Sequence, residues 1–338
     1  MRHILRILPV VVALTICGGY GVEKEETTKE AEEAKPVIQE LVVCNGDKRD
    51  VFVFAYDTSA SPERNTERLR TKSPLWRWHP DSSGMPPEVR DRFRGVNECK
   101  PVMGGKCVLI TSSWRGGGLA LIRRSDKKTL YVATKVSNAH SGEMLPDGNI
   151  VAASSGEKGF LRVFKVNRAD LDAGKLQPEQ PVGADVPLRW AHGVVWDRKR
   201  ACLWALGGYE ILQLTYTHEN DAPALKVAAR VVLPERGGHD LFPMLGDDDR
   251  LMVSTFRKNW LFNPETKTFA AFGRMTRGNV KSMSRLPAHD LLVTVAAEKS
   301  SHAPALLFTD AKGVETRVVV DGATFYKARW CVPNDFSY

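Results

Sequence analysis

Six basic side chains recur along the chain at intervals of 40, 52, 47, 42 and 46 residues. They are Lys100, His140, His192, His239, Lys281 and Lys327. Imidazole nitrogens are frequent ligands of divalent cations, whereas lysine ammonium groups attract carboxylates and phosphates. A fold that brought these residues together would therefore create a metal site, an anion site, or both.

Two chemistries follow if the six side chains meet. His140, His192 and His239 could hold one divalent metal ion, such as Mn, Zn or Ca, and leave open positions for water or a ligand. The alternative is a metal-free polar ring of all six residues that binds an anion or ordered water. In both cases the six residues are the predicted ligand-binding set.

The segments around these residues resemble one another, which indicates a repeat architecture. "NECKPVMGGKCVLITSS" (97–113) aligns with "NAHSGEMLPDGNIVAASS" (138–155): each has a polar start, a basic residue, a glycine turn, a β run and paired serines. Similar segments begin at residues 189, 236, 278 and 325. Further short β runs fill each interval, and four strands in about 45 residues are typical of a β-propeller blade.

The last copy, 325–338, ends after a single strand, and three unassigned strands lie at 40–45, 50–57 and 74–80. Joining them in one sheet pairs the edges that an open ring would expose. The sequence therefore predicts an all-β fold: a six-bladed β-propeller with four-stranded blades, closed by pairing of the N- and C-terminal strands. The same closure puts Cys44 and Cys331 on adjacent strands, either as a disulfide or as buried apolar residues.

The N-terminal part is predicted to lie outside the propeller. Residues 1–22 combine Arg2 and Arg6 with a short apolar stretch, as in an export signal, and Cys17 offers a lipid attachment site as the alternative to free secretion. Residues 23–39 form a charged, flexible spacer, and the propeller spans 40–338. We expect an extracytoplasmic monomer, periplasmic or secreted, with a membrane tether only if Cys17 is lipidated.

Net charge favours anionic partners. The chain carries +8, and setting aside the two Arg of the leader with the three Lys and six Glu of the spacer leaves +9 for the propeller. This surplus suits a small-molecule or oligosaccharide anion, although it also serves solubility. We expect no nucleic-acid partner, because the chain lacks a basic-aromatic nucleic-acid motif.

Several catalytic classes have no support in the sequence. It has no nucleophile elbow, HExxH helix, P-loop or CxxC pair, and no two carboxylates stand out as a glycosidase pair. Glu143 and Asp240, close to histidines of the set, could orient an imidazole or serve in turns. Trp190 either packs between blades or stacks on a sugar ring beside the channel.

The segments "AHSGEMLPDGNIVAASS", "HGVVWD…LWALGGYE" and "LPERGGHDLFP" resemble a family of secreted bacterial six-bladed propellers of unknown function, over residues 40–338. A more distant resemblance, to the oligogalacturonate lyases, implies a metal centre at His140, His192 and His239. It also implies β-elimination on a uronate, with Lys281 or Lys327 as the catalytic base. Those lyases are typically seven-bladed, and their further metal ligand has no identifiable counterpart here.

Three hypotheses result. The first is an exported propeller that binds an anionic ligand, such as a uronate or another carbohydrate, in a channel lined by His and Lys. The second is a divalent-metal-dependent polysaccharide lyase or hydrolase that uses the same channel. The third is a protein-interaction scaffold whose rim loops carry the function.

Overall fold

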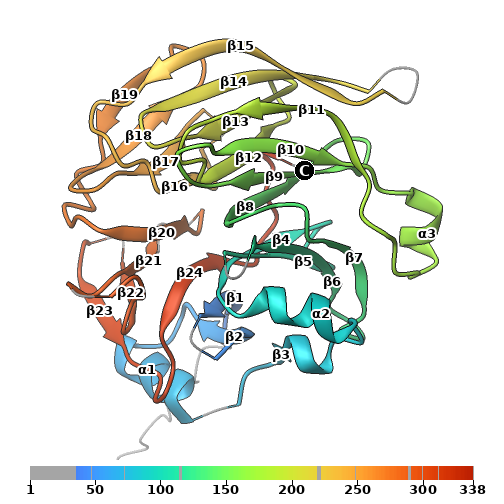
Figure 1. The fold of residues 1–338 in the computed structure, drawn as a ribbon. Helices are drawn as coiled ribbons and strands as arrows, with labels where there is room; N and C mark the ends of the chain where they lie inside the picture. Colours follow the sequence, from blue (N-terminus) through green and yellow to red (C-terminus); the bar gives the residue numbers. More distant parts are fainter. Residues whose placement is uncertain are drawn as a thin grey trace, which may run out of the picture. The chain divides into compact units, whose positions relative to one another are not determined.

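The computed structural model describes residues 36–337, apart from positions 47, 72, 114–115, 219–221, 248, 288–290, 299 and 311. The predicted leader with Cys17 lies outside the described residues, as does the spacer up to residue 35. The described residues form six four-stranded sheets of antiparallel strands arranged as a β-propeller (Figure 1). The predicted fold class is therefore confirmed.

One strand of each sheet lines the central channel. These inner strands are β4 (Val96–Val102), β8 (Ala139–Met144), β12 (Gly193–Asp197), β16 (Asp240–Pro243), β20 (Val280–Arg285) and β24 (Phe325–Trp330). Each inner strand contacts the inner strands of both neighbouring sheets, so the six form a closed ring.

The other strands follow outward in each sheet. The second strands are β1 (Ile38–Asn45), β5 (Cys107–Ser112), β9 (Ile150–Ser154), β13 (Cys202–Leu206), β17 (Leu251–Ser254) and β21 (Leu291–Val295). The third strands are β2 (Asp50–Asp57), β6 (Gly118–Arg123), β10 (Phe160–Phe164), β14 (Glu210–Thr217), β18 (Asn259–Asn263) and β22 (Leu306–Thr309). The outermost strands are β3 (Trp76–Trp78), β7 (Thr129–Ala133), β11 (Pro181–Pro187), β15 (Ala224–Val232), β19 (Thr268–Ala271) and β23 (Glu315–Val318).

The two ends of the described chain close the ring. Figure 1 shows the red strand β24 beside the blue strand β1, and the two pair antiparallel from Leu41 opposite Trp330 to Asn45 opposite Phe325. The sheet order β24-β1-β2-β3 is the closure that the strand count predicts. This pairing gives β1 a partner on both edges and gives β24 a partner on its outer edge.

The apolar runs of the sequence become strands buried on both faces. Every residue of β5, β9 and β13 is buried, whereas most of β15 and β19 is exposed at the rim. Core clusters join neighbouring blades: Leu109 and Leu119 of one blade pack with Ile150 and Phe164 of the next. Packing between sheets thus fixes the inner strands that carry the candidate site.

Helices are short and lie in the connections. They are α1 (Pro62–Thr71), α2 (Pro87–Arg90) and α3 (Arg168–Asp172), with 3-10 turns η1 (Pro80–Ser82) and η2 (Asp91–Phe93). The 3-10 turn η2 follows α2 directly in the chain. Within the described ranges, no helix has the length and apolar character needed to cross a membrane.

Of the two alternatives for Cys44 and Cys331, the disulfide is not formed. Both cysteines are free, and Cys44 lies against Cys99 of the neighbouring blade. The Cys331 sulfur lies 3.4 Å from Nη1 of Arg124. The strand pairing explains this, because Cys44 lies opposite the middle of β24 whereas Cys331 follows its end.

Candidate functional site

Irregular pairing near the start of the inner strands displays one side chain from each blade. In β4, β8 and β20, a register shift against the next strand leaves Asn97, His140 and Lys281 without an opposite residue. In β24, Tyr326 and Lys327 together lie opposite Cys44. An extra residue of this kind is a β-bulge, which bends the strand and redirects a side chain.

The remaining two blades place a histidine directly before the inner strand. The backbone N–H groups of His192 and His239 donate to the carbonyl oxygens of Leu206 and Ser254, which extends the ladders of β12 and β16 by one bond. Six equivalent positions result, which we call the mouth ring: Asn97, His140, His192, His239, Lys281 and Tyr326.

The mouth ring is a connected group of side chains. The ring centroids of His140 and His192 lie 4.2 Å apart, and those of His192 and His239 lie 4.7 Å apart. The Tyr326 hydroxyl lies 3.3 Å from Nδ1 of His140 and 3.0 Å from Nε2 of His239. Lys281 Nζ lies 3.3 Å from the same His239 nitrogen, and Asn97 Nδ2 lies 3.2 Å from His140 Nδ1.

A buried network of charges lies next along the same strands. Arg329 Nη2 donates to Glu98 at 3.1 Å and to Asp240 at 2.6 Å. Lys327 Nζ also contacts both carboxylates, at 3.1 Å and 3.2 Å. All four side chains are buried, so this network fills the channel beyond the mouth ring.

Two of the six predicted basic residues belong to this interior and not to the mouth ring. Lys100 Nζ is buried and donates to Glu143 at 3.0 Å and to the carbonyl oxygen of Val194 at 2.7 Å. Lys327 pairs with Glu98 and Asp240. Three carboxylates, Glu98, Glu143 and Asp240, line the same channel. Neither Glu143 nor Asp240 makes a described hydrogen bond to an imidazole.

Ion pairing keeps Glu98 and Arg329 ionised, whereas burial raises the pKa of Glu143 despite its pairing with Lys100. Burial favours the neutral form of Glu98, but Arg329 and Lys327 outweigh it and lower the pKa of this carboxyl to about 2. Burial disfavours the charged form of Arg329, but Asp240 and Glu98 raise the pKa of its guanidinium. The cations Lys100, Lys327 and Arg329 therefore balance the three carboxylates.

The histidines of the mouth ring are neutral. Burial lowers the pKa of His192 to about 4 and holds the pKa values of His140 and His239 well below their usual range. Repulsion by His192 and by the nearby lysines lowers the pKa values of His140 and His239 further. Their rings act here as hydrogen-bonding groups without charge.

Lys281 differs from the other channel cations because it has no carboxylate partner among the described residues. It is half-buried, and no carboxylate of the described chain lies within ion-pair distance of its Nζ. Burial and repulsion by Lys327 lower the pKa of this amine to about 8. Its close neighbours are the imidazole of His239 and the ring of Tyr326, whose centroid lies 6.0 Å away.

The metal role predicted for the three histidines stays a prediction. His140 Nε2 lies 3.1 Å from Asn138 Oδ1, and His192 Nδ1 lies 3.0 Å from the carbonyl oxygen of Trp190. In the part of the chain that the structure describes, no three His, Cys, Asp or Glu side chains form a group arranged to hold a metal ion.

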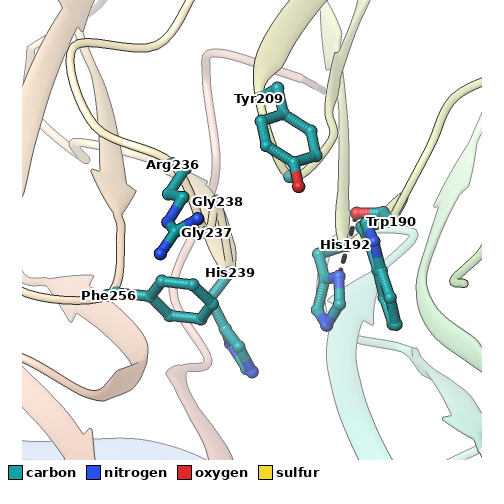
Figure 2. A pocket seen from close by; sticks show the side chains of 9 residues that line it. Trp190, His192, Tyr209, Arg236, Gly237, Gly238, His239 and Phe256 are labelled. Carbon is teal, nitrogen blue, oxygen red and sulfur yellow. Dashed lines mark hydrogen bonds between the residues drawn. The ribbon is translucent and has the colours of Figure 1, made fainter. Parts of the chain in front are cut away.

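A pocket of about 280 Å³ opens beside the mouth ring, and His192 and His239 form part of its wall. Figure 2 shows Arg236, Phe256 and His239 on one side of it and His192 and Trp190 on the other, with Tyr209 beyond them. Nδ1 of His239 is buried without a hydrogen-bond partner among the described residues. The pocket wall therefore combines aromatic rings with His239, whose Nε2 lies 3.3 Å from Lys281 Nζ.

Sequence reasoning missed Asn97 and Tyr326 in the ring and Tyr209, Arg236 and Phe256 in the pocket. The alignment places Lys100 three residues after Asn97, and Lys327 one residue after Tyr326. The polar side chains of Asn97, directly before Glu98, and of Tyr326, two positions before Ala328, were a weak available signal, because bulges are not visible in a repeat alignment. The pocket residues lie in connections between strands, where repeats diverge.

Comparison with solved structures shows the same fold at low sequence identity. A functionally unknown protein from Desulfotomaculum acetoxidans has a TM-score of 0.50 at 12% identity, covering 88% of this chain and 100% of that chain. A protein from Bacteroides fragilis, provisionally described as a 6-phosphogluconolactonase, has a TM-score of 0.52 at 14% identity, covering 87% and 98%. Apo AztD from Citrobacter koseri has a TM-score of 0.50 at 12% identity, covering 87% and 97%.

Comparison at the sequence level identifies a family. No curated protein matches the chain. A model described as a family of unknown function, DUF6528, matches residues 29–338. This match includes the whole propeller and confirms the predicted membership of a propeller family of unknown function. The chain belongs to the DUF6528 family.

Proposed function

We propose that the mouth of the channel binds a small anionic ligand, and that Lys281 supplies the positive charge that pairs with it. In this proposal the protein is an exported β-propeller that binds an organic acid, such as a uronate or another anionic carbohydrate. The ligand is held and not chemically changed.

The observation that carries the proposal is the isolated charge of Lys281. A half-buried ammonium group has lost part of its hydration, and a charge in that position is costly unless an opposite charge pairs with it. The other channel cations each have a buried carboxylate partner, but Lys281 has none among the described residues. A bound carboxylate would supply the missing partner and form a charge-assisted hydrogen bond.

The neutral groups around Lys281 suit an anion as well. The hydroxyl of Tyr326 and the unpaired Nδ1–H of His239 can donate hydrogen bonds, and neither brings a competing negative charge. Because the three histidines are neutral, the site contains no repulsive cluster of three imidazolium ions.

The buried network favours binding over the lyase hypothesis for one of its two candidate bases. Lys327 is buried and pairs with Glu98 and Asp240. A general base must reach the proton that it removes, and Lys327 has no path to a ligand at the mouth. Lys281 is left as the residue through which both binding and any proton transfer would act.

Titration calorimetry or protein-observed NMR with acetate, phosphate and glucuronate tests the proposal. We expect Lys281→Gln to weaken binding of the best of these anions by about tenfold or more, which is the contribution of one charge-assisted hydrogen bond. The matched control is Lys226→Gln, which removes the same charge from an exposed position on the outermost strand β15. Equal affinities in the two variants would contradict the proposal.

A further inference from the structure

The pocket beside the mouth ring has an aromatic wall. Trp190, Tyr209 and Phe256 line it, and their exposed fractions are 37%, 43% and 60%. Single exposed apolar side chains are ordinary on a folded protein, but a group of them around one pocket marks a binding surface. His239 connects the wall to Lys281, because it lines the pocket and its Nε2 lies 3.3 Å from the lysine Nζ.

The backbone at Trp190 is unusual for its residue type. Its φ angle is +55°, in the left-handed region that favours glycine and asparagine. Trp190 lies two residues before His192, and the residues two before His140, His239 and Lys281 also have positive φ. Those residues are Asn138, Gly237 and Asn279. Of these four blades, only the one with His192 places a bulky aromatic residue in this strained conformation.

Two glycines make room for the aromatic wall. A Cβ atom at Gly208 would lie 3.0 Å from Cβ of Trp190, closer than ordinary packing allows. A Cβ atom at Gly237 would collide with the ring of Phe256. Both glycines line the pocket themselves, so the backbone around the pocket is shaped to hold the two rings in place.

Few polar groups remain free on the pocket wall. The indole N–H of Trp190 already donates to Glu157 at 3.2 Å, which fixes the orientation of the ring. Besides the imidazoles and the Tyr209 hydroxyl, the wall offers the guanidinium of Arg236, which has no carboxylate partner in the described chain. A sugar ring would leave most of its hydroxyl groups unpaired here, which is costly on burial. A flat apolar ring has no hydroxyl groups that could be left unpaired.

We propose that the ligand of this protein is an aromatic carboxylate, whose ring lies against Trp190 and Phe256 while its carboxylate pairs with Lys281. The inference rests on the proposed function, since it uses the anion site as the anchor of the ligand. Aromatic rings stack favourably on indole and phenyl groups, and Arg236 at the same wall can bind a second acidic or hydroxyl substituent. The strained Trp190 is the residue that selects this class of ligand.

The test compares benzoate, acetate and glucuronate as probes of the same protein. We expect benzoate to bind at least about tenfold more tightly than acetate, and more tightly than glucuronate. Trp190→Asn should lower the affinity for benzoate to near that for acetate. Phe256→Ala, at a more exposed position, should lower it in the same direction.

The variant Trp190→Asn also separates loss of binding from loss of folding. Asparagine occupies the equivalent left-handed positions 138 and 279, so the melting temperature of this variant should equal or exceed that of the natural protein. Three results would each overturn the inference while leaving the anion site intact. They are benzoate affinity no higher than acetate affinity, a benzoate-to-acetate affinity ratio unchanged in Trp190→Asn, and glucuronate affinity higher than benzoate affinity. If Lys281→Gln changes neither the benzoate affinity nor the acetate affinity, the proposed function is overturned instead.

Discussion

At the scale of single residues, one lysine differs from every other cation in the channel. Lys100, Lys327 and Arg329 are buried with carboxylate partners, and they hold the structure together. Lys281 lies at the same channel, but its contacts are the neutral groups of His239 and Tyr326. A cation in such surroundings gains more from a bound anion than a solvated surface lysine does, because less water competes for its charge.

The lowered pKa of Lys281 predicts how binding depends on pH. The free amine carries its proton below a pKa of about 8, and an anion binds the protonated form. Affinity should therefore be constant below pH 7 and fall by about tenfold between pH 7 and pH 9. A binding titration at several pH values measures this, and an affinity that holds up to pH 10, as for an ordinary lysine, would refute it. Lys226→Gln should keep the same profile.

At the scale of elements, β24 has two roles. It closes the ring by pairing with β1, and it supplies Tyr326 to the mouth ring and Arg329 to the buried network. Arg329 joins three blades, because its partners Glu98 and Asp240 belong to β4 and β16. The strand thus links closure of the fold to the structure of the channel.

Replacing Arg329 should be far more damaging than replacing an exposed arginine. Arg329→Met leaves two buried carboxylates with one lysine between them, and we expect a loss of about 3–5 kcal/mol in the free energy of unfolding. Arg277→Ala removes an ion pair with Glu315 at the surface and should cost less than about 1 kcal/mol. Urea unfolding measures both. If Arg329→Met fails to fold, Arg329→Lys should fold with a smaller loss, and a cost for Arg329→Met below 1 kcal/mol would contradict this account of the network.

The strands could be predicted from the sequence, but the register of their side chains could not. Alternating β runs and glycine turns identify the blades and even the N- and C-terminal pairing, because these signals are local and repeated. The bulges at Asn97 and Tyr326 are set by contacts with the neighbouring strand and leave no local pattern. The alignment therefore places His140, His192, His239 and Lys281 at equivalent positions. In the other two blades it selects Lys100 instead of Asn97 and Lys327 instead of Tyr326.

At the scale of the whole molecule, ring closure assembles the site. His140 and Tyr326 are separated by 186 residues and lie within hydrogen-bond distance. The aromatic pocket likewise collects Trp190, Tyr209 and Phe256 from separate connections. Such loop residues cannot be placed from repeat spacing, which is why the sequence suggested a stacking role for Trp190 but gave no sign of its partners.

The net charge of the chain is a poor guide to the channel. A surplus of +8 suggests a basic interior, yet the buried cations Lys100, Lys327 and Arg329 are balanced by Glu98, Glu143 and Asp240. Burial requires this pairing, since an isolated charge in the interior is much costlier than one at the surface. The specific feature of the site is therefore one uncompensated lysine and not a high density of positive charge.

The most direct test of the account is the titration of Lys281 itself, followed by NMR of lysine-labelled protein with and without a saturating carboxylate. The Lys281→Gln variant assigns the resonance. We predict a midpoint near pH 8 in the free protein and a clear upward shift when the carboxylate is bound, because the anion stabilises the protonated amine. A midpoint that no carboxylate or phosphate moves would contradict the proposal that this lysine is the anion-binding group.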